Sequence, residues 1–508
     1  MVLPWLNPFA PGPTPNAMPL MFAWACVAII LGVVALYRPQ DRSANLSGAI
    51  ASAWLVAAVL SCCMGLLQYF GQTQGLGQWV SHTEMGEAFG NLRQRNQFAT
   101  LTSIGLVALL WQVAHWRPAV SGGDAASAPR GVPWPVWLAC AGLLAMGNAA
   151  SGSRTGLMQW CLVVALLAMW WRKMPWRACV VGLGAVALYL LAIRLLPWLL
   201  EVSTGFHAAG LMGRFNEEAG CSSRRVLWAN VLRLVTQKPW LGWGWGELGY
   251  AHFITLYPAE RFCDILDNAH NLPLHLAVEL GVPFSAVICT VLAWWVWRAA
   301  PWRETNASRQ LAWGVLAVIA LHSLVEYPLW YGPFQMAAGL AVGLLCLVPA
   351  AHGRTAVDAL PRSDASHFVP LALVLAAACA MFLVATVGYA AWDYWRVSQL
   401  YMLPAERAAA YRDDTMAKVR GSRLFDNQVQ FAELTTTNTS PESAEQLYST
   451  AQHLLHFSPE PRVIEKLIES ATLLGRDDEA LFYLQRYKAA FAQAHAAWAV
   501  ESGRNKTP

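Results

Sequence analysis

The residues best able to do chemistry are a histidine and two amides at the end of a long polar segment. They belong to the run Asp267-Asn268-Ala269-His270-Asn271-Leu272-Pro273-Leu274-His275, where residues 201–272 re-enter an apolar stretch. Imidazole is the side chain most easily tuned to take a proton near neutral pH. His270 is therefore a candidate general base at a membrane surface. The alternative is a histidine that only forms hydrogen bonds at an interface.

The same run predicts the start of a helix. Asp267 or Asn268 is expected to be its N-cap, and Pro273 suits its first turn. His275 follows His270 by five residues and falls on another helix face. It is expected to pack or to orient a neighbour rather than to bind a metal.

Arginines occur beside apolar segments at three places predicted to lie on the same side of the membrane as His270. Guanidinium binds phosphate in bidentate fashion and stays charged. Gathered around His270, these arginines predict a pocket for a lipid-linked phosphate. The alternative for each one is anchoring to lipid headgroups or pairing with an acid such as Asp264. The candidates are Arg93 and Arg95 before one span, Arg154 in a short turn between two spans, and Arg224 and Arg225 before an amphipathic helix at 226–237.

Two further ionisable residues, His322 and Glu326, lie late in an apolar segment and are followed by Tyr327. Ionisable residues within a span are unfavourable and therefore suggest a function. Because they are four residues apart, they are expected to share a helix face. They are expected to pair with each other, with an outward arginine or with His270. The alternative is a structural carboxylate–arginine pair between two helices.

Cysteines supply one predicted cross-link and no predicted metal site. Cys221 and Cys263 are the two cysteines in the polar segment, whereas the other nine lie in apolar runs. An outward compartment favours oxidation. A disulfide is therefore predicted to clamp the Arg224 segment against the His270 segment, with two separate buried thiols as the alternative. No CxxC pair or zinc-like His/Cys spacing occurs, and neither a metal nor another cofactor is expected.

Composition places all these residues on a membrane protein. The chain of 508 residues is 56% hydrophobic and 13% charged, whereas soluble domains are about 25% charged. About 20 apolar residues cross a bilayer. The fold class expected is an all-α polytopic membrane protein with ten to eleven transmembrane helices. The predicted spans are 18–37, 47–70, 97–115, 134–150, 155–171, 178–199, 273–297, 310–330, 333–350 and 368–391.

Positive charge predicts which loops face the cytoplasm. One set of short loops carries basic residues throughout, including Arg38, Arg117, Arg130 and Arg354, whereas the opposite short loops carry only the candidate arginines. The polar segment 201–272 and residues 392–508 are therefore predicted to face outward, into the periplasm of a Gram-negative cell. Since an outward N-terminus without a preceding helix is unusual, either another span precedes Met1 or the helix count is off by one.

Three domains are expected. Residues 1–17, rich in proline, read as an interfacial segment that is neither a signal peptide nor a helix. Residues 18–391 form the membrane domain with the outward loop 201–272, and residues 392–508 form a polar helical domain. Its residues 475–481 resemble part of a tetratricopeptide unit, and the domain is expected to dock a protein, with a stabilising lid as the alternative. Its predicted helices are 404–420, 424–436, 441–457, 459–474 and 477–499.

Several of these motifs, in this order, resemble one family. The chain is similar to bacterial O-linked protein glycosylation ligases (O-oligosaccharyltransferases) within the superfamily of O-antigen ligases and polymerases. The resemblance covers most of residues 1–350, although relatives usually carry one more span at the N-terminus. The matching pieces are Gly90 to Gln97, Ser151 to Arg154, Ser223 to Trp228, Pro239 to Gly244, Asp267 to His275 and Glu326 to Tyr331.

The resemblance implies a GT-C-like fold in the bacterial inner membrane and a metal-independent transferase. Its donor would be an undecaprenyl-pyrophosphate-linked glycan, and its acceptor a Ser or Thr of a pilin-like periplasmic protein. The essential histidine of the family matches His270, and its arginines match Arg154 and Arg224 and, less closely, Arg93 or Arg95. Substrate contacts are expected from Arg225, Asn271, Glu326 and Tyr327. The Trp-Gly repeat at 240–246 would line the glycan entrance or anchor the loop at the membrane.

Three other functions compete with this one. An O-antigen ligase or polymerase of the same superfamily would use a sugar as acceptor. A transporter or channel would need more charge within its spans and an inverted repeat, neither of which is evident. A scaffold would not need arginines gathered at an outward face. No nucleic-acid partner is expected.

Overall fold

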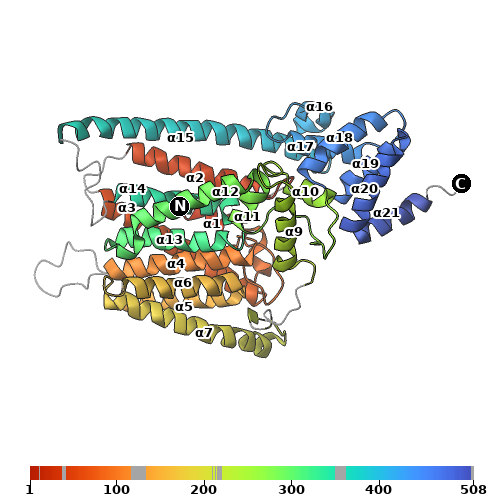
Figure 1. Cartoon of the computed structure of the whole chain (residues 1–508). Coiled ribbons are helices and arrows are strands. Elements are labelled where there is room, and N and C mark those ends of the chain that lie inside the picture. The colour runs from red at the N-terminus through yellow and green to blue at the C-terminus, as the bar shows by residue number, and fades with distance from the viewer. Residues whose placement is uncertain are drawn as a thin grey trace, which may run out of the picture. The chain divides into compact units, whose positions relative to one another are not determined.

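The computed structural model is built from helices, and the residues that it describes contain no strand (Figure 1). The described residues do not include several basic residues that were used to predict the orientation, namely Arg38, Arg117, Arg130 and Arg354. The described residues are 1–10, 12–36, 42–115, 133–208, 210, 211, 213, 220–348 and 362–504.

Helices occupy all ten segments that were predicted as spans. By length and composition, six stretches are able to cross a membrane, namely 17–36, 46–69, 95–115, 176–204, 282–303 and 373–401. The chain is thus a polytopic helical membrane protein, and the count of ten to eleven spans stays a prediction. The helices are α2 (Ala17–Leu36), α3 (Arg42–Tyr69), α4 (Arg95–His115), α5 (Trp134–Ser151), α6 (Arg154–Trp170), α7 (Trp176–Thr204), α11 (Leu272–Leu280), α12 (Val282–Ala299), α13 (Ala307–Ser323), α14 (Gly332–Leu347) and α15 (Arg362–Ser398).

The predicted span 273–297 is wrong as one continuous helix, because the structure divides it at Gly281. This glycine has φ +88°, and a Cβ atom there would lie 2.1 Å from the carbonyl oxygen of Trp240. Only glycine tolerates that backbone and that close approach. The candidate span therefore begins at Val282, and the helix after His270 is the separate α11.

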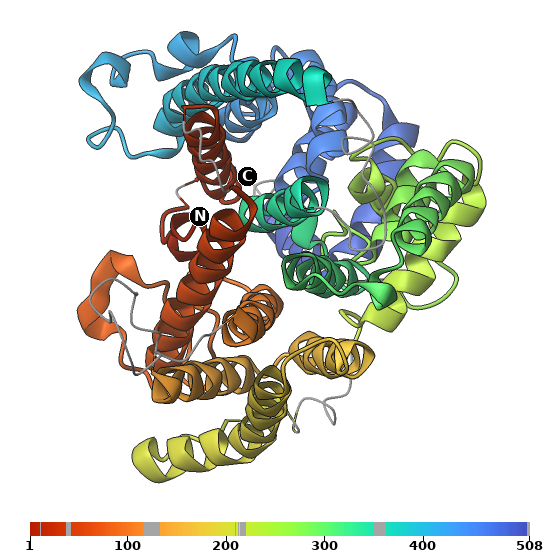
Figure 2. The same ribbon diagram turned by 90° about the vertical axis from the view of Figure 1, so that its left-hand side faces the viewer.

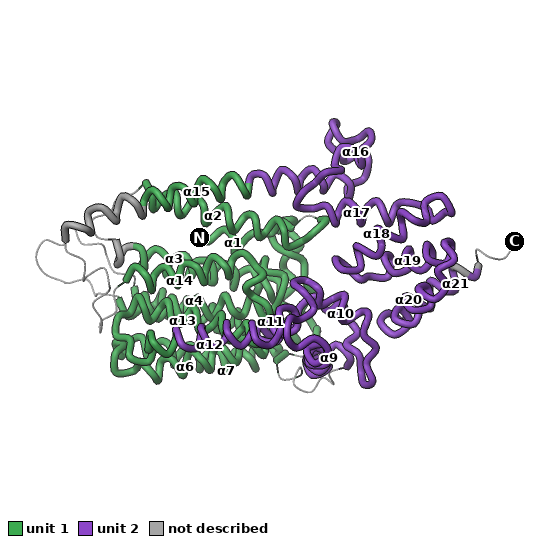
Figure 3. Tube along the Cα trace, turned by 45° about the horizontal axis from the view of Figure 1, so that its top comes forward, with its two compact units in different colours: residues 1–217, 296–387 green, residues 218–295, 388–508 purple. Residues whose placement is uncertain are grey.

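The chain forms two compact units, coloured in Figure 3. Unit 1 comprises residues 1–217 and 296–387, and its long helices run alongside one another (Figures 1 and 2). Its central helix is α4, which packs against α3, α5, α6, α7 and α13, and 83% of its spanning window is buried. The residues at the start of α4 are therefore attached to the most firmly enclosed helix of the unit.

Unit 2 comprises residues 218–295 and 388–508, and its described residues contain three apolar cores. The helix α10 (Leu248–Ile254) contributes to two of them. Its Leu248 and Ala251 pack in one core with Ala269, while its Phe253 packs in the core of the C-terminal helices. The remaining helices of this unit are α9 (Arg224–Gln237), α16 (Thr415–Val419), α17 (Asp426–Thr436), α18 (Ala444–Phe457), α19 (Pro461–Leu473), α20 (Asp477–Ala490) and α21 (Ala492–Arg504).

Three predictions about helices need correction. Residues 404–420 hold only short pieces, η5 (Ala409–Tyr411) and α16, because Pro404 and the left-handed Asp414 interrupt the backbone. Residues 477–499 divide at Phe491 into α20 and α21. The N-terminal segment contains one helical turn, α1 (Leu3–Leu6), with Pro4 in its first turn. The proposed domain boundaries and the resemblance to a tetratricopeptide unit stay predictions.

Candidate functional site

The loop that carries His270 is fastened at several points within unit 2. A disulfide joins Cys221 to Cys263, whose Cα atoms lie 5.5 Å apart. The indole N–H of Trp228 on α9 donates to the carbonyl oxygen of Ala269 at 3.1 Å. Because Trp228 follows Arg224 by one helical turn, this bond ties the Arg224 segment to the residue before His270, and the disulfide ties it to Cys263 in the same loop.

His270 itself has a left-handed backbone, with φ +50°. Its backbone N–H donates to Oδ1 of Asn268 at 2.9 Å. Non-glycine residues adopt this conformation rarely, and such strain is concentrated at functional sites. Arg93, with φ +60°, is another of the four described non-glycine residues with positive φ. Two of these four residues are thus candidates already selected from the sequence.

The helix after His270 is capped differently from the prediction. The N-cap is Asn271, whose Oδ1 accepts the N–H of Leu274 at 3.0 Å, and not Asp267 or Asn268. Pro273 does lie in the first turn. Since the Asn271 oxygen caps α11, this amide fixes the exit of the chain from His270. Its predicted contact with substrate stays a prediction.

His275 is buried one turn before Glu279, with Nε2 3.5 Å from Oε2. The rings of His275 and Trp245 form a T-shaped pair whose centroids lie 6.0 Å apart. The backbone N–H groups of Trp243 and Gly244 donate to the carbonyl oxygens of Val278 and Glu279, each at 2.9 Å. The Trp-Gly repeat is therefore a turn packed on the end of α11, while Trp240, Leu241 and Trp245 stay exposed.

Three candidate arginines are the first residues of helices. Arg95 begins α4, Arg154 begins α6 and Arg224 begins α9. A cation is electrostatically unfavourable at a helix N-terminus, where free N–H groups already attract anions. At each of these three positions, the guanidinium group and the backbone N–H groups of the helix start therefore attract an anion together.

Polar side chains cap these helices. Ser153 Oγ accepts the N–H of Gly156 at 3.0 Å, and Ser223 Oγ accepts the N–H of Val226 at 3.3 Å. Gln94 Oε1 accepts the N–H of Gln97 at 2.8 Å. The serines immediately before Arg154 and Arg224 are the available sequence signal for these helix starts.

A hydrogen-bonded network in unit 1 holds the start of α6. Asn96 Nδ2 donates to Glu326 Oε1 at 3.0 Å, and Ser153 Oγ donates to Asn96 Oδ1 at 2.6 Å. Glu326 and Ser153 are buried, whereas Arg154 is exposed. The buried network therefore fixes the start of α6, and Arg154, its first residue, lies at the surface. Sequence reasoning missed Asn96, although it lies within the motif that contains Arg93 and Arg95.

The same polar arrangement continues deeper into unit 1. Thr100 Oγ1 lies 2.9 Å from Nδ1 of His322, and Gln159 Nε2 donates to Thr100 Oγ1 at 2.8 Å. The prediction that His322 and Glu326 share a helix face is wrong, because α13 ends at Ser323. Leu324 to Tyr327 form a turn that leads into η3 (Pro328–Trp330), so Glu326 reaches α4 instead of packing along α13.

The remaining predicted substrate residues have partners or positions of their own. Arg95 forms an ion pair with Glu87 at 2.8 Å, and Arg93 donates to the carbonyl oxygen of Pro8. Tyr327 stacks on Tyr331 with ring centroids 5.7 Å apart. Arg225 is exposed beside Arg224. Unit 1 thus joins the Arg154 and Glu326 segments, and unit 2 joins the Arg224 and His270 segments.

One buried histidine of the loop 201–272 is unsuited to take part in proton transfer. His252 Nδ1 lies 2.8 Å from the Tyr257 hydroxyl, and Nε2 lies 3.1 Å from the carbonyl oxygen of Phe262. Burial, together with the positive charge of nearby Arg261, lowers the pKa of His252 to about 3. This imidazole is therefore neutral and structural.

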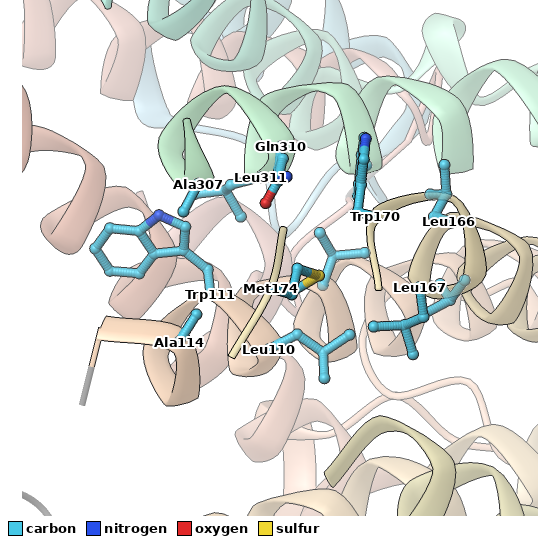
Figure 4. A pocket seen from close by; sticks show the side chains of 13 residues that line it. Leu110, Trp111, Ala114, Leu166, Leu167, Trp170, Met174, Ala307, Gln310 and Leu311 are labelled. Atoms are coloured by element: carbon cyan, nitrogen blue, oxygen red, sulfur yellow. The ribbon is translucent and has the colours of Figure 1, made fainter. Parts of the chain in front are cut away.

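Figure 4 shows a cavity in unit 1 that is too small and too apolar to hold a diphosphate. Its volume is about 30 Å³, and it is lined by apolar side chains such as Leu110, Leu167 and Met174, with the amide of Gln310 among them. No charged residue lines it. Within the described ranges, no three His, Cys, Asp or Glu side chains form a group suited to a metal ion.

Comparisons with known families agree with the motifs. Residues 88–111 match the family described as protein glycosylation ligase, and residues 138–289 match the family described as O-antigen ligase. Residues 310–505 match the C-terminal region of the virulence factor membrane-bound polymerase family. The first two matches include Arg93, Arg95, Arg154, Arg224 and His270.

Two similar proteins come from Acinetobacter baylyi. A general O-oligosaccharyltransferase is 24% identical over 327 residues, which cover 60% of this chain and 51% of that protein. A ComP-specific O-oligosaccharyltransferase is 27% identical over 124 residues, which cover 24% of this chain and 22% of that protein. The matched region thus spans about half the length of the first relative and about a fifth of the second.

Proposed function

We propose that this chain, whose resemblance to O-antigen ligases and protein glycosylation ligases is confirmed by these three matches, transfers a glycan from a lipid-linked diphosphate to a protein hydroxyl. The observation that carries the proposal is the placement of arginines at the first position of three helices, together with the strained backbone of His270. The donor is an undecaprenyl-pyrophosphate glycan, and the acceptor is a Ser or Thr of a pilin-like protein. The names of the two relatives support a transferase of this kind.

In the proposed reaction, His270 removes the proton of the acceptor hydroxyl while its oxygen attacks the anomeric carbon. The bond between this carbon and the diphosphate oxygen breaks, and the diphosphate leaves with the bonding electron pair. A positioned general base contributes roughly 10²–10⁴-fold in rate. The imidazolium afterwards releases its proton to solvent, which restores the enzyme.

Arg224 and Arg154 stabilise the charge that grows on the leaving diphosphate. Guanidinium placed in advance for this charge is often among the largest contributions to catalysis. Serine caps and hydrogen bonds fix the backbone of both residues, so little reorganisation is needed during the reaction. Arg93 and Arg95 guide the donor, and Asn271, Glu326, Tyr327 and Arg225 complete the substrate contacts.

The proposal includes a location and an orientation. The chain lies in the bacterial inner membrane with residues 201–272 and 392–508 in the periplasm, where donor and acceptor meet. The C-terminal helices dock the acceptor. Removing residues 400–508 would also uncover Phe253 of α10. The KM for the acceptor after that removal is therefore measured together with the stability of the loop 201–272. An unchanged KM with an intact loop would contradict docking of the acceptor by the C-terminal helices.

The test is transfer by the purified full chain in nanodiscs, with extracted lipid-linked glycan and a pilin acceptor, followed by mass spectrometry of the acceptor. His270→Ala is expected to lower the rate at least about 10²-fold by loss of the base. His207→Ala is the matched control, because His207 is largely exposed outside the site. A chelator is expected to leave the rate unchanged.

The outcomes separate the competing functions. Glycan found only on lipid A, or only as longer chains, would indicate the O-antigen ligase or polymerase function that two of the family matches keep open. Full transfer by His270→Ala would contradict the proposed mechanism. A transporter would move glycan across the membrane without modifying any acceptor.

A further inference from the structure

A second cavity of about 270 Å³ lies at the end of unit 1 that carries Arg93. The N-terminal segment, the start of α4 and the start of α14 form its walls, and several prolines give these walls a rigid backbone. Unlike the cavity in Figure 4, it is lined by many polar side chains. These side chains include Asn7, Asn16, Arg93, Gln94, Gln97 and Tyr331.

The side chain of Gln97 indicates that this cavity receives a ligand. Gln97 is only 3% exposed and lines the cavity, yet among the described residues its amide group has no hydrogen-bond partner. Its backbone N–H is the group that binds Gln94. The amide atoms of Gln97 are not among the fully buried unpartnered atoms of the described residues, so they are open to the cavity and can bind a ligand there.

The walls of the cavity select the chemistry of that partner. Amide groups both donate and accept hydrogen bonds, as sugar hydroxyl groups do. No acidic side chain lines the cavity, which disfavours a cation, and Arg93 adds donors for ring or hydroxyl oxygens. Tyr331, whose ring stacks on Tyr327, is the aromatic residue of the lining and adds apolar surface for the C–H groups of a pyranose.

The size of the cavity agrees with a small ligand. Ligand pockets usually measure about 300–1,000 Å³, and this one lies just below that range. A single water molecule would satisfy one amide but needs far less space. We propose that the cavity binds one saccharide unit of the glycan on the donor, an inference that rests on the proposed function.

The probe for this site is the water-soluble oligosaccharide released by mild acid from the lipid-linked donor. Its binding to the full chain in phosphatidylcholine nanodiscs is measured by saturation-transfer NMR and calorimetry. Gln97→Leu removes the amide at similar volume and is expected to weaken binding about three- to tenfold, the effect of one or two hydrogen bonds. Gln112→Leu on the same helix is the control, because Gln112 contacts Ser52 outside the cavity.

A second variant guards against misfolding of the first. Asn16 is exposed at the edge of the cavity, so Asn16→Ala is expected to fold normally and to weaken binding two- to threefold. In the transfer assay, Gln97→Leu is expected to raise the KM for the donor while kcat stays unchanged. Equal binding by wild type, Gln97→Leu and Asn16→Ala would show that the cavity holds water only and would overturn the proposal.

Two further outcomes separate the possible errors. If the oligosaccharide binds in phosphatidylcholine nanodiscs but not in phosphatidylglycerol nanodiscs, a lipid headgroup occupies the cavity. This result would also overturn the proposal. If wild type transfers glycan normally and Gln97→Leu has an unchanged KM for the donor, the saccharide site is contradicted. The proposed function is then still supported. Absence of transfer by wild type contradicts the proposed function, and the binding measurements still decide whether the cavity recognises a saccharide.

Discussion

The two units hold their candidate arginines in different ways. In unit 1, the start of α6 at Arg154 rests on hydrogen bonds from Ser153 through Asn96 to Glu326. In unit 2, the Arg224 and His270 segments are joined by a disulfide and by an indole–carbonyl bond over an apolar core. Where water is excluded, hydrogen bonds between side chains are strong enough to fix geometry. A loop outside the apolar helices needs covalent and apolar attachments, because water competes for its polar groups.

The largest effect is expected from breaking the network of unit 1. Asn96→Leu removes both of its hydrogen bonds and leaves the Ser153 hydroxyl and the Glu326 carboxylate without this partner. The cap of α6 then shifts, and a displacement of about 1 Å at a catalytic group lowers rate roughly 10²-fold. The measurement is kcat for glycan transfer in nanodiscs.

Ser153→Thr is the control for the network, since threonine keeps a hydroxyl that caps the helix. Its kcat is expected to stay within about twofold of wild type. A normal kcat for Asn96→Leu would mean that hydrogen bonds in unit 1 do not position Arg154, and the contrast between the units would fail.

A smaller effect is expected from removing the cross-link of unit 2. Cys221→Ser with Cys263→Ser opens a loop closed over a sequence separation of 42 residues. Disulfides of native proteins typically contribute about 2–4 kcal/mol. The loop is therefore expected to be digested faster by protease, and reductant is expected to have the same effect on wild type.

Cys289→Ser is the control for this change, because Cys289 is a free thiol on α12. Equal digestion of the double variant and of wild type, with and without reductant, would show that the apolar core alone holds the loop.

The smallest effect concerns the buried histidine of the same loop. Burial lowers the pKa of His252 to about 3 in the folded state, while the unfolded imidazole titrates near 6.5. Below pH 6.5 the unfolded state binds more protons, so the loop loses stability as pH falls toward 3, by on the order of 1–2 kcal/mol near pH 5.

The measurement is protease digestion of the loop between pH 7 and pH 5, with an acid-tolerant protease. His252→Gln, which has no titrating group, is expected to show a weaker pH dependence than wild type. A pH dependence identical to that of wild type would show that another group controls the acid sensitivity of unit 2.

Local chemistry made several features predictable from the sequence. Hydropathy located ten helical segments because each apolar run must satisfy its backbone within itself. The pair Cys221 and Cys263 stood out because every other cysteine lies in an apolar run. Pro273 announced a helix start because its ring suits the first turn. Each of these inferences needed only the residue types along the chain and no knowledge of which distant segments touch.

Contacts between distant residues decided what the sequence left open. The break at Gly281 depends on the backbone of Trp240, 41 positions earlier, and periodicity contains no information about it. The bond from Asn96 to Glu326 spans 230 positions. The four-residue spacing of His322 and Glu326 suggested a shared face of α13, whereas in the structure Glu326 contacts α4. The sequence by itself determined most of the helical segments and most of the residues able to do chemistry. Only the tertiary structure decided which polar side chains fix them, because those partners are brought together by packing and not by spacing.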